Sequence, residues 1–225
     1  MLGALHFVVM RSQWSHVPMR TLTLIVVSFL SAISSTVTSA TAEAQAVLSV
    51  GGHVGAVRAR QLQDRGEDSG TRTGLLAGAY VVALTPVTWL SVLAEASYAE
   101  RGGRFPFSDE ADADVRAGYL AFAVAPTVRI GVGPVALAAY AGPGVETSVS
   151  TRYSPHLAGA YDTPTAQVFI ALVGAGLEVS PTRQWTLRMD IRHVEGVSAA
   201  FNNDAGDFRH RSTEILLRVG RRGRP

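Results

Sequence analysis

The sequence predicts an all-β protein: a closed, antiparallel, up-and-down transmembrane β-barrel of about eight strands, preceded by a signal peptide. Three observations lead to this prediction. The N-terminal part of the 225-residue chain has the order of elements found in an export signal. The remainder consists of segments of roughly ten residues in which apolar and polar side chains alternate. The connections between these segments are alternately short and long, as in outer-membrane barrels.

Residues 1–46 are predicted to be a signal peptide with an upstream start extension. Met19-Arg20 precedes an apolar run from Leu22 to Ile33, and a small polar stretch then ends in Ala44-Gln45-Ala46. A basic residue, an apolar run and an A-x-A sequence in this order are typical of a secretory signal. The apolar run is shorter than the ~20 residues of a spanning helix. We therefore expect cleavage after Ala46 and a mature barrel domain over 47–225.

The alternation of side chains defines the strands. In the clearest segment Leu187, Met189 and Ile191 share one face, and their polar neighbours point to the other, because side chains alternate across a strand. The predicted strands are 47–60, 72–85, 89–101, 115–130, 135–150, 166–179, 185–198 and 209–220.

The connections predict which end of the barrel faces the periplasm. Short turns lie on the periplasmic rim of an outer-membrane barrel and long loops on the outer rim. Trp89 and Trp185 follow short turns, and Tyr98 lies near the opposite rim, as expected for interfacial aromatic residues. The short connections are 86–88, 131–134 and 180–184, and the long ones are 61–71, 102–114, 151–165 and 199–208.

Two prolines interrupt predicted strands. Pro126 and Pro143 each remove a donor from the ladder of a barrel that has no edge strand. Gly142 and Gly144 flank Pro143. We expect a local β-bulge here, across which the inward and outward faces would exchange.

The composition of the polar face indicates that it lines a narrow lumen. Alternation by itself also fits a soluble, lipocalin-like barrel with an apolar interior. Here, however, the polar face is mostly Gly, Ala and Ser with a few charges of both signs, and the apolar face has no charge in the strand interiors. Small residues fit a narrow lumen, whereas an Arg facing lipid at the midplane costs about 2–4 kcal/mol. The charges predicted to form a lumen network are Glu95, Arg129, Glu146, Glu178, Arg188, Asp190, Arg192, Glu214 and Arg218.

Five short motifs follow one another along the mature chain. They are Leu93–Tyr98 with Arg101-Gly102-Gly103, Tyr119–Pro126, Ala141–Gly144, Gly174–Glu178, and Asp190–His193 with Gly196. In order and spacing they resemble the outer-membrane β-barrel domain family (porin-family, PorT-like small outer-membrane proteins). The resemblance implies a small, monomeric barrel in the bacterial outer membrane, usually without a known reaction.

Composition limits the chemistry that is available. The chain has no Cys, so disulfides, thiol catalysis, thiolate metal sites and a lipid anchor on Cys are excluded. Its 20 basic residues, all Arg, are scattered among 18 acidic ones, so no basic stripe suggests a nucleic-acid partner. No cofactor or metal is expected, because the acidic stretch from Asp109 to Asp114 lacks the Gly and terminal Glu of a calcium loop. Arg101, Arg104 and Arg116 flank this stretch and are candidates to contact lipopolysaccharide phosphates, although rim arginines also snorkel without a specific ligand.

One constellation resembles a hydrolase site. His210, Ser212 and Glu214 share a face of the last strand, and a His–Ser pair with a carboxylate resembles the outer-membrane lipid A deacylases. However, neighbouring same-face residues of a strand are about 6.5–7 Å apart, which is too far for a direct Ser–His hydrogen bond. The face also points away from lipid, so we do not expect an enzyme.

The sequence thus predicts an integral outer-membrane barrel, monomeric and non-conducting, with a structural or surface-interaction role. Its expected partners are outer-membrane lipid, lipopolysaccharide and an unknown extracellular ligand bound through the long loops. The alternatives are a narrow passive porin, a lipid A-modifying esterase that uses His210 and Ser212, and a soluble lipocalin-like carrier.

Export is expected to remove residues 1–46, because Ala44-Gln45-Ala46 completes the signal. The intact mass of protein from an outer-membrane fraction should then match a chain that begins at Val47. A mass that retains Leu22–Ile33 would contradict the signal-peptide interpretation.

Overall fold

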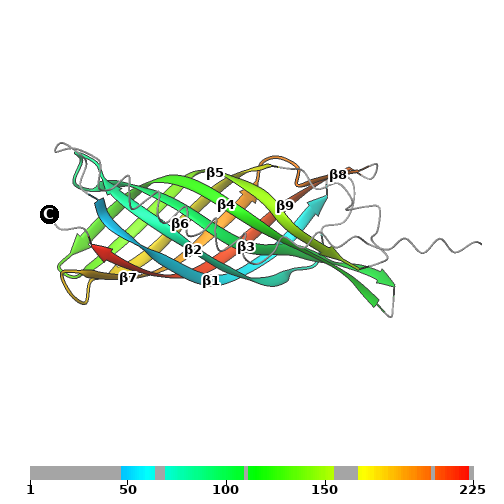
Figure 1. Ribbon diagram of the computed structural model, residues 1–225, viewed down its shortest axis with the longest axis horizontal. Coiled ribbons are helices and arrows are strands. Elements are labelled where there is room, and N and C mark those ends of the chain that lie inside the picture. The colour runs from blue at the N-terminus through cyan, green and yellow to red at the C-terminus, as the bar shows by residue number, and fades with distance from the viewer. Residues whose placement is uncertain (1–46, 64–68, 109–110, 155–166, 204–205, 223–225) are drawn as a thin grey trace, which may run out of the picture. The chain divides into compact units, whose positions relative to one another are not determined.

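The wall of the protein is one antiparallel sheet that closes on itself (Figure 1). The computed structural model describes residues 47–63, 69–108, 111–154, 167–203 and 206–222. The predicted cleavage residues Ala44 and Ala46 lie outside these ranges. Within these ranges, no helix has the length and apolar character needed to cross a membrane.

Eight strands form the barrel wall, and a ninth, short strand lies beside the last of them. The sheet order follows the chain from β1 to β7 and continues to β9, and the pairing of β1 with β9 closes the barrel. This arrangement confirms the predicted fold class. The strands are β1 (Val47–Gln63), β2 (Arg72–Leu84), β3 (Leu90–Ser108), β4 (Ala111–Val132), β5 (Val135–Tyr153), β6 (Val168–Val179), β7 (Trp185–Gly196), β8 (Phe201–Asn203) and β9 (Gly206–Arg222).

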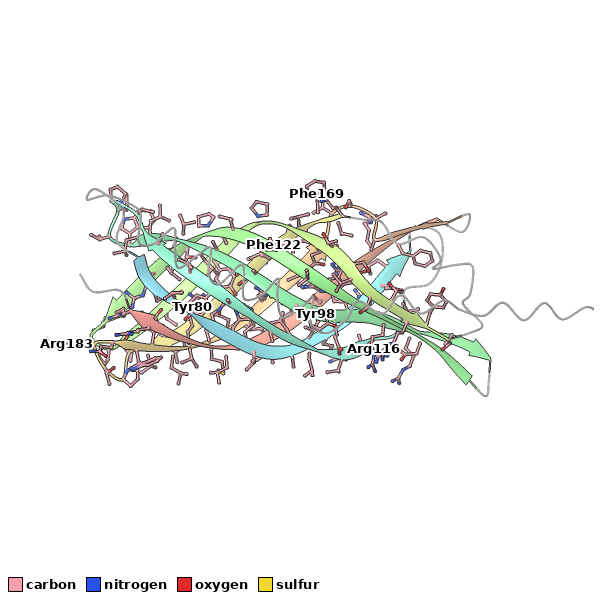
Figure 2. All side chains as sticks on the ribbon, in the orientation of Figure 1. Tyr80, Tyr98, Arg116, Phe122, Phe169 and Arg183 are labelled. Atoms are coloured by element: carbon pink, nitrogen blue, oxygen red, sulfur yellow. The ribbon has the colours of Figure 1, made fainter. Side chains whose placement is uncertain are left out.

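Side chains on each strand alternate between the interior and the outer surface. On β7, Met189 and Ile191 are 60% and 58% exposed, whereas the neighbouring Asp190 is 1% exposed. Large apolar side chains cover the outside in the same way on the other strands, and Phe169 is among them (Figure 2). A continuous, exposed apolar surface of this kind requires lipid rather than water around it.

Strands β3 and β4 are longer than the sequence predicted. The pairing runs from Leu90↔Val128 to Ser108↔Ala111, so most of the expected loop 102–114 is a β-hairpin. Between β3 and β2, the continuous ladder ends at Leu76↔Ala99, with one further bridge at Gly70↔Arg104. The hairpin therefore projects beyond its neighbours (Figure 1). Its polar composition resembled a loop because residues beyond the membrane need no apolar face.

The bulge that we expected at Pro143 is absent from the described ladders. Ala123 pairs with Gly144 and Thr127 with Tyr140, so the register is the same on both sides of the prolines. The inward and outward faces consequently do not exchange.

Between β4 and β5, close packing replaces part of the ladder. The pairing is interrupted over residues 124–126 and 141–143. A Cβ atom on Gly142 would lie 2.1 Å from the Val124 carbonyl oxygen, so the two backbones approach closely there. A register shift does occur farther along, where Gly118 pairs with Ser150 but Tyr119 pairs with Ser148.

The two rims differ as the sequence indicated. Trp89 and Trp185, next to short turns, are 54% and 48% exposed, which suits residues of an interfacial belt. Arg183 lies at this end of the barrel, and Arg116 lies toward the opposite end (Figure 2). We refer to the end with the long connections as the outer rim.

Candidate functional site

A continuous series of ion pairs crosses the barrel interior. It combines four arginines with four carboxylates, contributed by strands β3, β5, β7 and β9. We call it the interior ion-pair chain. Its members, in order of contact, are Arg188, Asp190, Arg218, Glu95, Arg192, Glu214, Arg101 and Glu146.

Three of the arginines each bridge two carboxylates. Arg218 donates from Nε to Asp190, at 2.5 Å, and from Nη2 to Glu95, at 2.8 Å. Arg192 donates to the other oxygen of Glu95 and, at 2.6 Å, to Glu214. The planar guanidinium group suits this role because its five N–H donors point in fixed, separate directions.

Arg101 occupies the outer end of the chain. It donates to Glu146, to Glu214 at 2.6 Å and to the hydroxyl of Ser212 at 3.2 Å. We expected Arg101 at the outer rim, but its side chain is inside and 2% exposed. The reason is the length of β3: the strand continues past Arg101, which is six residues from Glu95 and therefore on the same face.

Glycines and tyrosines make room for these side chains. A Cβ atom on Gly176 would lie 1.8 Å from the Asp190 carboxylate, so a larger residue there would displace this carboxylate. The Arg188 guanidinium lies 5.1 Å from the ring centre of Tyr140, and that of Arg218 lies 5.2 Å from Tyr80. Both distances are typical of cation–π contacts, which help to retain buried arginines.

A smaller cluster lies near the rim with the short turns. Glu178 accepts hydrogen bonds from Arg129 at 2.7 Å and from Arg222 at 3.3 Å. The side chains of Arg129 and Arg222 are 28% and 27% exposed, so this cluster is partly hydrated. In its exposure to water, this cluster is closer to a surface ion pair than the interior ion-pair chain is.

Apolar side chains are also buried inside the barrel. Val57, Leu76 and Leu216 belong to one cluster, and Val115, Ile170 and Phe208 belong to another. The sequence analysis missed these clusters because it considered the inward face only as a polar surface. The inward-facing apolar run on β6, of Val168, Ile170 and Leu172, was the available signal.

All nine charges predicted for the lumen lie inside the barrel, where each forms an ion pair. The prediction omitted Arg101 and Arg222. Arg104 and Arg116 are exposed on the outer surface, as expected for rim residues. Asp114 pairs with Arg72, and Asp109 and Glu110 lie outside the described residues. In the part of the chain that is described, no cluster of His, Asp and Glu side chains is arranged to hold a metal ion.

The hydrolase-like residues do not form a His–Ser pair. Ser212 donates to Glu214 at 3.1 Å and accepts from Arg101. His210 Nε2 lies 3.0 Å from a carboxylate oxygen of Glu146, and no hydrogen bond joins His210 to Ser212 in the described part of the chain. His210 and Ser212 are each 1% exposed, so lipid does not reach them from outside the barrel. Carboxylate and guanidinium groups surround Ser212, and the imidazole is not placed to activate it.

Comparison with known proteins agrees with this architecture. Residues 25–222 match the family described as outer membrane protein beta-barrel domain. The chain therefore belongs to that family and is an integral protein of the bacterial outer membrane. A sequence comparison with curated proteins gave no match.

Several solved structures are similar to this chain. OprG from Pseudomonas aeruginosa has a TM-score of 0.55 at 9% identity, with 81% of this chain and 98% of that chain covered. Ail of Yersinia pestis has a TM-score of 0.37 at 15% identity, with 78% and 98% covered. Neisserial surface protein A has a TM-score of 0.44 at 12% identity, with 76% and 96% covered. The likeness to OprG supports the barrel fold.

Arg192→Gln should destabilise the barrel, because it leaves Glu95 and Glu214 buried with one cation fewer. Breaking a buried ion pair from one side costs about 3–5 kcal/mol. Arg129→Gln is the matched control, since the same change at a partly hydrated pair costs about 0–1 kcal/mol. Urea unfolding of the barrel in lipid vesicles measures both, and equal losses would contradict the distinction between the two clusters.

Proposed function

We propose that this protein is a non-conducting, monomeric outer-membrane barrel without catalytic activity that serves as a scaffold for interactions at the cell surface. The observation that carries the proposal is the interior ion-pair chain. It links side chains from β7 and β9 through Glu95 on β3 to Glu146 on β5, so it reaches across the lumen rather than along one wall.

The filled interior supports the absence of conductance. An eight-stranded barrel has an interior just wide enough for side chains to fill. Here the filling consists of arginines that each contact one or two carboxylates, with buried apolar side chains beside them. A permeating ion would have to separate these pairs, which opposes passage through the barrel.

The projecting hairpin supports a role at the surface. Phe105–Ser108 and Ala111–Ala113 extend past the ladders that β3 and β4 form with β2 and β5, so no described strand pairs with their outer edges. Arg104 faces outward near its base, where lipopolysaccharide phosphates would lie. A partner at the hairpin would not need to enter the barrel.

The unmodified protein should show no steady open steps in a planar bilayer, because the interior ion-pair chain fills the lumen. The paired change Arg218→Ser with Asp190→Ser removes one cation and one anion, which leaves the net interior charge unchanged. We expect this variant to open more often. Steady conductance of the unmodified protein would contradict the proposal and favour a narrow passive porin.

The β3–β4 hairpin should be accessible from outside the cell. A protease recognition sequence inserted between Ser108 and Ala111 is expected to be cleaved in intact cells. The same sequence inserted at Gly133, in the short turn between β4 and β5, is the control and should be protected until the outer membrane is permeabilised. The opposite pattern would reverse the orientation of the barrel.

A further inference from the structure

The outer surface of β7, β9, β1 and β2 changes from apolar to basic over a few residues. The strand register places Ile191, Ile215, Ala56 and Leu75 in one row across the four strands. Ile191, Ile215 and Leu75 are 58%, 55% and 70% exposed, so this row faces lipid. It is the apolar row that directly precedes the two charged rows.

The next two outward rows carry the charge. His193, Thr213, Arg58 and Thr73 form the first of them. In the second, Glu195 is opposite Arg211, and Arg211 is opposite Arg60. Two arginines therefore face each other directly across the β1–β9 ladder.

Like charges that are directly opposite in a ladder repel each other. One carboxylate is present in these rows: Glu195 accepts from Arg211 Nε at 2.9 Å and from Nη2 at 2.7 Å, and it lies 3.3 Å from His193 Nε2. Arg58 and Arg60 add two further positive charges beside that pair. The two rows therefore carry a net positive charge and are electrostatically complementary to an anion.

A groove connects the two kinds of surface. Its volume is about 650 Å³, and its lining includes Arg58, Arg60 and Arg211 together with His193, Ala56 and Ile215. Basic groups thus lie along one end of the groove and apolar side chains along the other. A free phosphate would use only the basic end, whereas an amphipathic phospholipid or glycolipid would use both.

We propose that this groove binds one phosphorylated glycolipid of the outer leaflet, of the lipid A type. Its phosphate would lie against Arg58, Arg60 and Arg211, whose planar N–H donors match phosphate oxygens. Its acyl chains would begin on Ile191, Ile215 and Ala56. The inference rests on the proposed function for one point, the assignment of this rim to the cell surface.

The site can be tested with the full-length protein purified from outer membranes in detergent. Titration with diphosphoryl lipid A, followed by native mass spectrometry, should show one tightly bound molecule per barrel. Arg58→Gln combined with Arg60→Gln should weaken this binding about tenfold or more, because hydrogen bonds between charged groups are lost. Dephosphorylated lipid A should bind the unmodified protein with a similar loss.

A second pair of opposed arginines provides the matched control. Arg116 and Arg152 face each other outward across β4 and β5, but the register places Gly118 and Ser150 next to them instead of an apolar row. Arg116→Gln with Arg152→Gln removes the same charge from the same rim and should leave the tight binding unchanged. An equal loss in both double variants would overturn the proposal in favour of general attraction to a basic rim.

Two competitors distinguish the source of the phosphate. Inorganic phosphate at the same concentration should not displace lipid A, and displacement would indicate a simple anion site. Phosphatidylglycerol should compete weakly, and equal competition would indicate a site for any anionic lipid. Either result would contradict the proposal. Conductance tests the interior independently, because Arg58 and Arg60 lie on the outer surface, so the two proposals can fail separately.

Discussion

The whole structure depends on the closure of one hydrogen-bonded sheet. In hydrocarbon each unpaired backbone N–H or C=O group costs several kcal/mol, so a sheet in lipid cannot leave an edge unpaired. The β1–β9 ladder, which runs from Ser49↔Arg222 to Gln63↔Phe208, provides the missing pairing. Once the sheet is closed, half of the side chains must face lipid and the other half must share a narrow interior. The composition of both surfaces follows from this division.

Arginines and carboxylates alternate along the interior ion-pair chain, so the buried charges neutralise one another. Each carboxylate of the interior ion-pair chain contacts an arginine from another strand or from its own strand. Buried ion pairs contribute little net stability, because desolvation offsets much of the attraction. Their value here is spatial: long side chains anchored at both ends fill the lumen with fixed neighbours. Glycines such as Gly174 and Gly176 provide the space that these side chains need.

The sequence predicted the strands well because the membrane imposes a strict alternation. On β7 that alternation is complete from Trp185 to Val194, and it correctly separated Ile191 from Arg192. The sequence analysis misplaced Arg101 because it ended β3 where the membrane ends, whereas the ladder with β4 continues. It also could not identify which charges pair. Arg192 and Glu95 are far apart in sequence, and their contact depends on the curvature of the closed barrel. The sequence could not predict the groove at Arg60 and Arg211 either, because the register between β1 and β9 places these two residues opposite each other.

The interrupted ladder between β4 and β5 makes the barrel mechanically uneven around its circumference. Pro126 and Pro143 supply no N–H donor, and the pairing is missing over the surrounding residues. Close contact at Gly142 holds the two backbones together there, but such contact resists separation only over very short distances. Lateral tension from a thinning or bending bilayer would therefore be concentrated at this seam. The wall can yield there while the β1–β9 ladder, which is continuous over its described length, remains intact.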